Sequence, residues 1–329
     1  NSQFPEAVAT LGKLVKIPGI AWESFDSNSL DRSAAAVAAE LEALQMFDTV
    51  EIRRSAKPDG ELGAPAIVAR RAGASDAPHV LLYAHHDVQP PGARELWKTE
   101  PFEATLIGDR LFGRGASDDK SGIITHLYSL KTLKKLASSL RLGITVFIEG
   151  EEEAGSESFP NFLRENQADL AADLIIVADS GNWSEDVPAL TTSLRAMVSQ
   201  TFTIRTLDHA VHSGMYGGPL PDATGAMIKL LATLTDEQGN VAIAGLDSIP
   251  VDGPDLSDAE FGVAAGLLPG VKRLGTKSAT QQIWGEPAVT VIGMDIPQVD
   301  VSSNTAQPES RARISLRLAP SQDPDTGLE

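Results

Sequence analysis

His85 and Asp87 follow a short apolar segment, residues 80–84, whose composition is typical of a buried β-strand. Pro90 indicates that the chain turns into a loop soon afterwards. Side chains two residues apart in a strand point to the same face, so we expect His85 and Asp87 to lie together. A carboxylate can then accept one ring N–H and leave the other nitrogen free to bind a metal ion. The pair alone is equally consistent with an ordinary polar strand end.

Further carboxylates lie where other apolar segments end. Asp118 lies between a glycine-rich turn and the start of a predicted helix, and Asp179 ends another apolar segment. Glu152 and Glu153 belong to a run of four glutamates at 149–153, after the most apolar segment of the chain. Helix capping, a turn or a solvated surface could explain each of these groups by itself. Independent causes would not gather them all at one edge of a sheet.

The combined set of groups predicts a metal centre. One imidazole nitrogen with several carboxylate oxygens suits zinc, manganese or cobalt, and two ions can share a bridging carboxylate. The negative charges of neighbouring glutamates at a strand end repel one another, and a bound cation would offset that repulsion. A spare glutamate beside a ligand glutamate suits a general base that activates a metal-bound water. The expected chemistry is therefore metal-assisted hydrolysis.

Predicted strands alternate with predicted helices in the part of the chain that must position these groups. Helices are expected at residues 4–17, 33–46 and 121–140, and strands at 49–54, 66–71, 79–84, 142–149 and 174–178. This order predicts an α/β domain in residues 1–195, with a largely parallel sheet and flanking helices. In such sheets the ligand site lies beyond the carboxyl ends of the strands. Residues 196–329 are expected to form a smaller α+β domain with one sheet face open to solvent.

The composition narrows the class of protein. The 329 residues are 42% hydrophobic and 22% charged, as in an ordinary soluble globular protein. The absence of cysteine excludes disulfides, thiolate zinc sites and cysteine nucleophiles. A net charge of −18 argues against nucleic acid or an anionic membrane as a partner, and no apolar run is long enough to span a membrane. No signal peptide is visible, so the expected location is cytoplasmic.

Three motifs carry a resemblance to a known family. Residues 83–90 (YAHHDVQP), 113–120 (GRGASDDK) and 149–156 (EGEEEAGS) resemble those of the M20 metallopeptidases, in particular the carnosinase and Cys-Gly dipeptidase branch. The resemblance implies a di-zinc catalytic domain with a smaller lid domain inserted in it. It also implies hydrolysis of peptide bonds in dipeptides by a hydroxide that bridges the metal ions, and a homodimer formed through the lid domain.

The resemblance assigns a role to each metal-binding group. His85 and Asp179 would hold one zinc ion, and Glu153 the other. Asp118 would bridge the two ions, and Mn²⁺ or Co²⁺ would suit the same ligands. A cis peptide bond is expected between Asp118 and Asp119, since the family often has one after the bridging aspartate.

The resemblance also assigns the catalytic groups. Asp87 would orient His85, and Glu152 would be the general base. His212, in a His-Ser-Gly motif, would reach the active site of the partner subunit and stabilise the oxyanion. Arg317 would pair with the terminal carboxylate of the substrate. Polar surface positions are the plainer alternative for both of these last two residues.

One departure from the family pattern is serious. Members of the family supply a second metal-binding histidine near their C-terminus, but no histidine follows His212. We therefore expect a lid domain that is incomplete at its C-terminus, no returning catalytic segment, and one ion bound more tightly than the other. Two alternatives stay open: an N-acyl-amino-acid deacylase or desuccinylase of the same superfamily, and a metal-binding fragment without catalytic activity.

Overall fold

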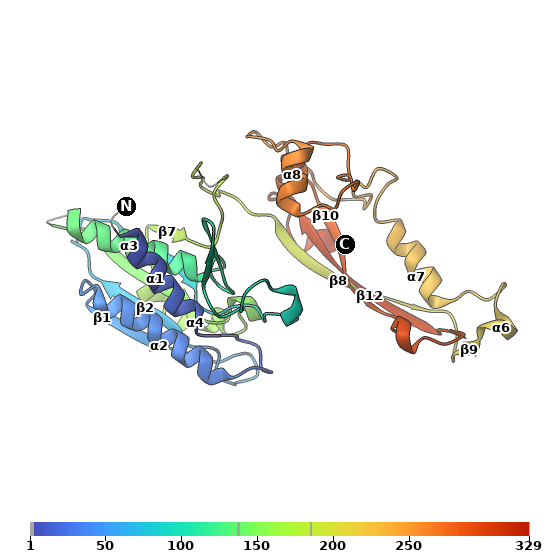
Figure 1. Cartoon of the computed structure of the whole chain (residues 1–329), viewed down its shortest axis with the longest axis horizontal. Helices are drawn as coiled ribbons and strands as arrows, with labels where there is room; N and C mark the ends of the chain where they lie inside the picture. Colours follow the sequence, from blue (N-terminus) through green and yellow to red (C-terminus); the bar gives the residue numbers. More distant parts are fainter. Residues whose placement is uncertain (1–2, 137–138, 185, 329) are drawn as a thin grey trace. The chain divides into compact units, whose positions relative to one another are not determined.

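The computed structural model describes residues 3–136, 139–184 and 186–328 (Figure 1). The chain divides into two compact units, Asn1–Ala189 (unit 1) and Leu190–Glu329 (unit 2). In unit 1, a five-stranded sheet has the strand order β1-β2-β6-β3-β7. Its strands are β1 (Thr49–Arg53), β2 (Ala66–Arg71), β3 (His79–His85), β6 (Gly143–Glu149) and β7 (Leu174–Val177). A separate two-stranded ladder joins β4 (Thr105–Ile107) to β5 (Arg110–Phe112).

The five-stranded sheet is mixed, which corrects the expectation of a largely parallel sheet. Strand β3 runs parallel to both β6 and β7, but β2 runs antiparallel to both β1 and β6. Parallel neighbours need a long crossover, which is usually a helix. The connection between β1 and β2 contains no helix, so these two strands return on each other in opposite directions. The parallel half of the sheet, β6-β3-β7, contains the strands that precede the predicted site.

Helices α1 (Phe4–Val15), α2 (Ser27–Ala43) and α3 (Lys120–Leu136) confirm the three helices expected in this unit. Of the expected third helix, residues 137–138 lie outside the described residues, and residues 139–140 are not helical. Helix α2 begins six residues before the expected residue 33. The carboxylate of Asp26 accepts the backbone N–H of Asn28 and caps the helix there. Two short helices, α4 (Phe159–Glu165) and α5 (Gln167–Leu170), lie between β6 and β7.

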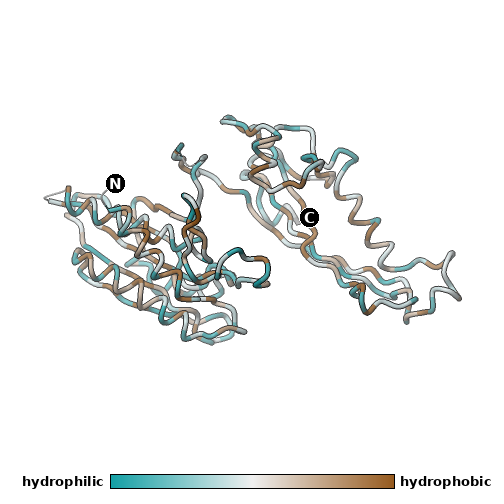
Figure 2. The backbone as a smooth tube through the Cα atoms, viewed as in Figure 1, coloured by the Kyte–Doolittle hydropathy of each residue, from teal (hydrophilic) through white to brown (hydrophobic). Residues whose placement is uncertain are grey.

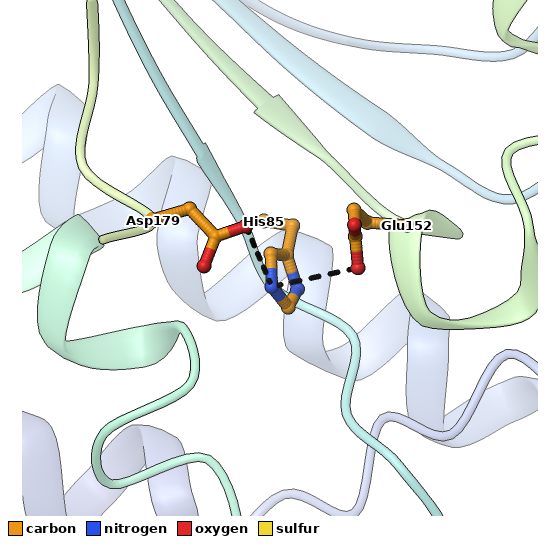
Figure 3. Close-up of side chains that lie close together, drawn as sticks. All are labelled: His85, Glu152 and Asp179. Carbon is orange, nitrogen blue, oxygen red and sulfur yellow. Dashed lines mark ion pairs between the residues drawn. The ribbon is translucent and has the colours of Figure 1, made fainter. Parts of the chain in front are cut away.

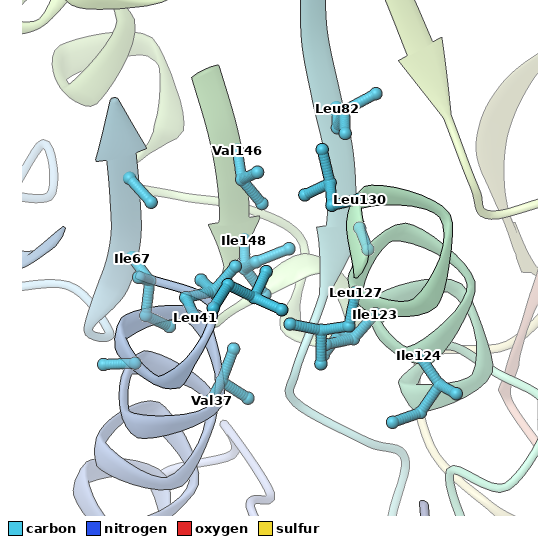
Figure 4. Packing of buried hydrophobic residues seen from close by; sticks show 14 of the residues in the cluster. Val37, Leu41, Ile67, Leu82, Ile123, Ile124, Leu127, Leu130, Val146 and Ile148 are labelled. Atoms are coloured by element: carbon cyan, nitrogen blue, oxygen red, sulfur yellow. The ribbon is translucent and has the colours of Figure 1, made fainter. Parts of the chain in front are cut away.

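The main core lies between helices α1, α2 and α3 and one face of the sheet (Figure 4). Both the helices and the strands contribute buried side chains to this core: Leu14, Val37, Leu41, Ile67, Leu82, Ile123, Leu127, Val146 and Ile148. The hydrophobic residues recur along the helices at intervals that keep them on the covered side (Figure 2). Strand β6 is buried along its whole length, so the glutamates that follow it start from a rigid base.

A second cluster covers the opposite face of the sheet, where Phe147 stacks against Phe159 and Phe162. The cover does not extend to strand β7, whose four residues, Leu174–Val177, are all exposed. Strand β7 is therefore an apolar strand at the edge of the sheet.

Unit 2 is built on an antiparallel sheet with the order β10-β12-β8. Its strands are β8 (Ala196–Arg205), β10 (Ala288–Asp295) and β12 (Glu309–Leu318), and β9 (Val211–His212) pairs separately with β11 (Thr305–Ala306). Its helices are α6 (Ser213–Tyr216), α7 (Ala223–Ala232), α8 (Asp258–Ala265) and α9 (Ala279–Trp284). Helix α7 packs on β12 and β8. Buried and exposed residues alternate along β12, so one face of this sheet is covered and the other faces solvent.

Among the described residues, no helix combines the length and the apolar character that crossing a membrane requires.

Candidate metal centre

His85 is the centre of a cluster of side chains at the carboxyl end of β3. Its side chain is completely buried, and its Nε2 lies 3.1 Å from Oδ1 of Asp118. Carboxylate oxygens of Glu152 and Asp179 each lie 3.9 Å from the same nitrogen (Figure 3). Nδ1 lies 3.1 Å from the backbone carbonyl of Asp87, so it must donate. In the neutral ring, Nε2 then carries a free lone pair directed toward the carboxylates.

The carboxylates around His85 form two groups that share its imidazole. One group consists of His85, Glu152 and Asp179, and the other of His85, Asp118 and Glu153. Within each group, the candidate ligand atoms all lie within 4.8 Å of one another. The structure therefore brings together the five residues that the sequence predicted to lie at one edge of the sheet. It also places Glu152, the predicted base, where its carboxylate could contact an ion.

The carboxylates repel one another in this partly buried setting. Burial raises the pKa of Glu152, Glu153 and Asp179, and the neighbouring carboxylates raise each one further. Burial alone would lower the pKa of His85, but the hydrogen bond to Asp87 and the surrounding negative charges outweigh it and raise the pKa to about 10. A metal cation could replace this proton, because it would neutralise the same carboxylates.

Asp87 connects the two strand ends that carry the cluster. Its side chain is completely buried, and its Oδ1 lies 3.3 Å from Nδ1 of His85. The same carboxylate accepts the backbone N–H groups of Glu152, at 3.2 Å, and Glu153, at 3.0 Å. The sequence predicted that Asp87 orients His85. The additional bonds to the glutamate loop are visible only in the structure.

The other two glutamates of the run have different surroundings. The carboxylate of Glu149 accepts hydrogen bonds from the hydroxyls of Tyr83, at 2.7 Å, and Ser156, at 2.6 Å. The buried carboxylate of Glu151 accepts two backbone N–H groups, from Ala64 and Ser158. Glu149 and Glu151 therefore anchor the loop, and only the next two glutamates face the cluster. Sequence analysis did not separate these functions, because all four side chains are chemically alike.

The segment after Asp118 is also held by buried charged groups. Oδ2 of Asp119 accepts the backbone N–H of His85 at 3.1 Å, and the peptide bond between Asp118 and Asp119 is cis, as expected. The ammonium group of Lys120 donates to the backbone carbonyls of Leu14, at 2.9 Å, and Ile17, at 2.8 Å. These bonds join the end of α1 to the loop that presents Asp118. The spacing of the residues alone had not shown these supports.

The other two predicted site residues lie in unit 2. The exposed ring of His212 accepts the backbone N–H of Gly214 on Nδ1, at 3.0 Å. Arg317 is exposed on β12, where it pairs in register with Met197 and Ala288. Neither residue belongs to the compact unit that contains the acidic cluster.

The sequence that contains this cluster matches a known protein family. A model of peptidase family M20/M25/M40 matches residues 81–304, which include the whole cluster around His85. The chain belongs to this peptidase family. The resemblance inferred from the three motifs is thereby confirmed.

Relatives within the M20 family are longer than this chain. It is 36% identical over 259 residues to a cysteinylglycine-S-conjugate dipeptidase of Corynebacterium striatum, which covers 78% of this chain and 57% of the relative. It is 30% identical over 203 residues to a beta-Ala-His dipeptidase of Rattus norvegicus, which covers 60% of this chain and 41% of the relative. The chain thus spans about half the length of these two relatives.

Solved structures share the fold. The dipeptidase Dug1p from Saccharomyces cerevisiae matches 99% of this chain and 72% of its own, with a TM-score of 0.79 and 20% identity. Human carnosine dipeptidase 1 gives the same coverages and TM-score, with 23% identity. The mixed sheet with flanking helices is therefore an M20-type fold.

The residues of this M20 chain fit a divalent metal ion. The two groups share one imidazole nitrogen, so His85 can complete the ligand set of one ion, and one nitrogen with two carboxylate oxygens is a set that zinc and similar ions accept. The hydrogen bond from Nδ1 to the Asp87 carbonyl leaves Nε2 as the coordinating atom. A relative from Schizosaccharomyces pombe, 28% identical over 266 residues, is named a Cys-Gly metallodipeptidase.

Three other histidines of this unit have structural partners. His86 is completely buried between the hydroxyl of Ser33 and the carbonyl of Pro65. His126 lies 2.9 Å from the carbonyl of Tyr83, and His79 lies 2.8 Å from the hydroxyl of Thr145. In each of these three histidines a ring nitrogen therefore contacts a group of the fold.

Proposed function

We propose that the protein hydrolyses peptide bonds in short peptides, dipeptides in particular, with divalent metal ions bound at the cluster around His85. The observation that carries the proposal is the convergence of one buried imidazole and four carboxylates from separate loops. Membership of the M20 family supports it, as do relatives that are named dipeptidases. No nucleic acid or membrane partner is proposed.

The proposed ligands are those that the resemblance to the M20 family implies, and all four belong to the cluster around His85. His85 and Asp179 would hold one ion, Glu153 would hold the other, and Asp118 would be shared by them. Zinc is the proposed metal, and Mn²⁺ or Co²⁺ would suit the same atoms. When bound, such ions would polarise the scissile carbonyl and lower the pKa of a water molecule. The chain would contribute the orientation of these ligands through Asp87.

Glu152 is the proposed general base. Its carboxylate is 40% exposed and accepts no hydrogen bond from any other described residue, so its lone pairs are available. Its backbone N–H is held by Asp87, which keeps the side chain at the edge of the cluster. Glu152 would take a proton from the attacking water and pass it to the leaving nitrogen of the substrate.

His212 is the proposed donor to the oxyanion. Because the N–H of Gly214 points at Nδ1, the neutral ring must carry its proton on Nε2, which makes Nε2 a donor. This exposed side chain would act at the site of a partner subunit. Residues 196–329 would then form the lid and dimerisation domain of a homodimer, and residues 1–195 the catalytic domain. Arg317 would pair with the terminal carboxylate of the substrate.

The substrate class is tested by rates measured on this chain with zinc, manganese or cobalt added. Cys-Gly and beta-Ala-His should be cleaved faster than N-acetyl and N-succinyl amino acids. Faster cleavage of the acylated compounds would favour a deacylase or desuccinylase. If no substrate is turned over although metal is bound, the chain is an inactive metal-binding fragment, and the proposed function fails for it.

Glu152→Gln tests the mechanism. The substitution removes the proton acceptor and keeps the size of the side chain, so kcat should fall by about 10²–10⁴-fold. Zinc uptake, measured by calorimetric titration, should persist. Retained turnover in this variant would remove Glu152 from the role of general base.

A further inference from the structure

The adjacent glutamates Glu152 and Glu153 differ in what holds their carboxylates. The side-chain amide of Gln89 donates to Oε2 of Glu153 at 2.7 Å and to the backbone carbonyl of the same residue at 3.1 Å. The carboxylate of Glu152 accepts no hydrogen bond in the described part of the chain, and it lies 3.9 Å from Nε2 of His85. The carboxylate of Glu153 is therefore held by Gln89, and the carboxylate of Glu152 is not held by a hydrogen bond from any described residue.

The identity of the Gln89 atom that faces Glu153 follows from chemistry. Both contacts are to oxygen atoms that can only accept, because one is a backbone carbonyl and the other a carboxylate. The amide nitrogen, which has two N–H donors, must face them, since the amide oxygen would meet two acceptors. Gln89 is half-buried and directly precedes Pro90, which restricts its backbone. It is therefore a fixed double donor.

Gln89 acts at a different point from Asp87. Asp87 holds the ring of His85 and the backbone N–H groups of Glu152 and Glu153, so it supports both glutamates equally. Gln89 supports them unequally, because in the described part of the chain it donates to the carboxylate of Glu153 and not to that of Glu152. A hydrogen-bonded carboxylate keeps one oxygen in place and turns the other outward, as a metal ligand requires. A general base, in contrast, must move its carboxylate between the attacking water and the leaving group.

We propose that Gln89 is the positioning residue that makes Glu153 a metal ligand and leaves Glu152 free to transfer protons. The proposal rests on the proposed function, because it assigns the two glutamates within that site. Gln89 touches neither substrate nor ion in this role. It acts through the orientation of Glu153, in the group that contains His85 and Asp118.

The test is a Co²⁺ titration of the full chain, followed by visible absorption and by calorimetry. Gln89→Met keeps the length of the side chain and removes both donors, and Gln89→Glu places a carboxylate against a carboxylate. In both variants the ion held by Asp118 and Glu153 should bind about 10–100-fold more weakly. Gln89→Glu should reduce the affinity for this ion more than Gln89→Met does. The ion held by His85 and Asp179 should keep its affinity. The absorption band of the affected ion should shift, because its ligand geometry changes.

A matched control comes from unit 2. Gln322 is buried, accepts the N–H of Asp247 and donates to the carbonyl of Gly245, each at 2.9 Å. Gln322→Met removes a comparable pair of hydrogen bonds far from the proposed ligands in sequence. It should change thermal unfolding of the metal-free chain without altering either cobalt affinity. This control separates a loss of orientation at Glu153 from a general loss of stability.

The outcomes separate this proposal from the function on which it rests. If both Gln89 variants bind two ions with unchanged affinities and an unchanged spectrum, Gln89 has no positioning role, and the proposed function survives. Equal weakening of both ions would also contradict the proposal, because Gln89 would then support the cluster as a whole. If the unsubstituted chain takes up no cobalt or zinc, the proposed function and this inference both fail.

Discussion

In unit 1 the side chains of His85 and Asp87 are completely buried, whereas in unit 2 those of His212 and Arg317 lie on the surface. The buried pair lies at the end of β3, a strand that has neighbours on both sides, and further buried carboxylates hold the surrounding loops. Among the described residues, the ring of His212 is held by the backbone N–H of Gly214, and Arg317 by its strand register. Unit 1 thus orients its groups through its own core, while the groups of unit 2 remain accessible to another molecule.

This contrast makes different predictions for substitutions in the two units. Changes in the buried network of unit 1 should affect metal binding and folding together. Changes at the exposed residues of unit 2 should affect turnover alone.

His212→Ala should lower kcat by about 10²–10³-fold, which is the cost of removing one oxyanion donor. Because the ring is exposed, thermal unfolding and zinc uptake should match those of the unsubstituted chain. Steady-state kinetics on a dipeptide checks the first point, and calorimetry checks the second. His209, three residues earlier and also exposed, provides the matched control, and His209→Ala should leave kcat unchanged. Equal losses in the two variants would contradict a specific role for His212.

Zinc should stabilise unit 1, because only the folded chain brings His85 and the carboxylates together. A free zinc concentration of 100 times Kd should add about 2.7 kcal/mol to the free energy of unfolding, measured with urea. Calorimetric titration should show two unequal steps, with one ion bound more tightly than the other. Asp179→Ala should remove most of the protection. Equal and tight binding of two ions would contradict the predicted inequality.

Glu151→Leu should destabilise the metal-free chain, because two buried backbone N–H groups, of Ala64 and Ser158, lose their acceptor. The expected loss is about 1–3 kcal/mol in the free energy of unfolding, measured with urea. The same change at Glu157, an exposed glutamate close by in sequence, is the control and should have little effect. Similar values for both variants would show that Glu151 is not an anchor.

Ile176→Ala should change the free energy of unfolding by about 0.5 kcal/mol or less, because β7 is exposed on this chain. The same substitution at Ile148, which is completely buried in β6, is the control and should cost several times more. Urea unfolding of the two variants measures the difference. A large loss at Ile176 would show that another molecule or segment covers the edge strand in solution.

The sequence alone predicted the fold class of unit 1 and the residues of its acidic cluster. The period-two pattern placed His85 and Asp87 on one face, and the alternation of strands and helices predicted an α/β unit with acidic groups at the strand ends. These conclusions succeed because they depend on local rules, namely strand geometry, helix period and the position of loops after strands. The motifs added the family, which the comparison confirmed.

Only the tertiary structure decided the separate roles of the four glutamates at and after the end of β6. Glu149 and Glu151 face donors on Tyr83, Ser156, Ala64 and Ser158, which are distant in sequence or lie across the loop. The direction of β2 was likewise beyond local rules, because it depends on which strand lies beside it. The supports from Gln89 and Lys120 had no local signal either. A side chain's role in such a site depends on its partners, and folding alone brings those partners together.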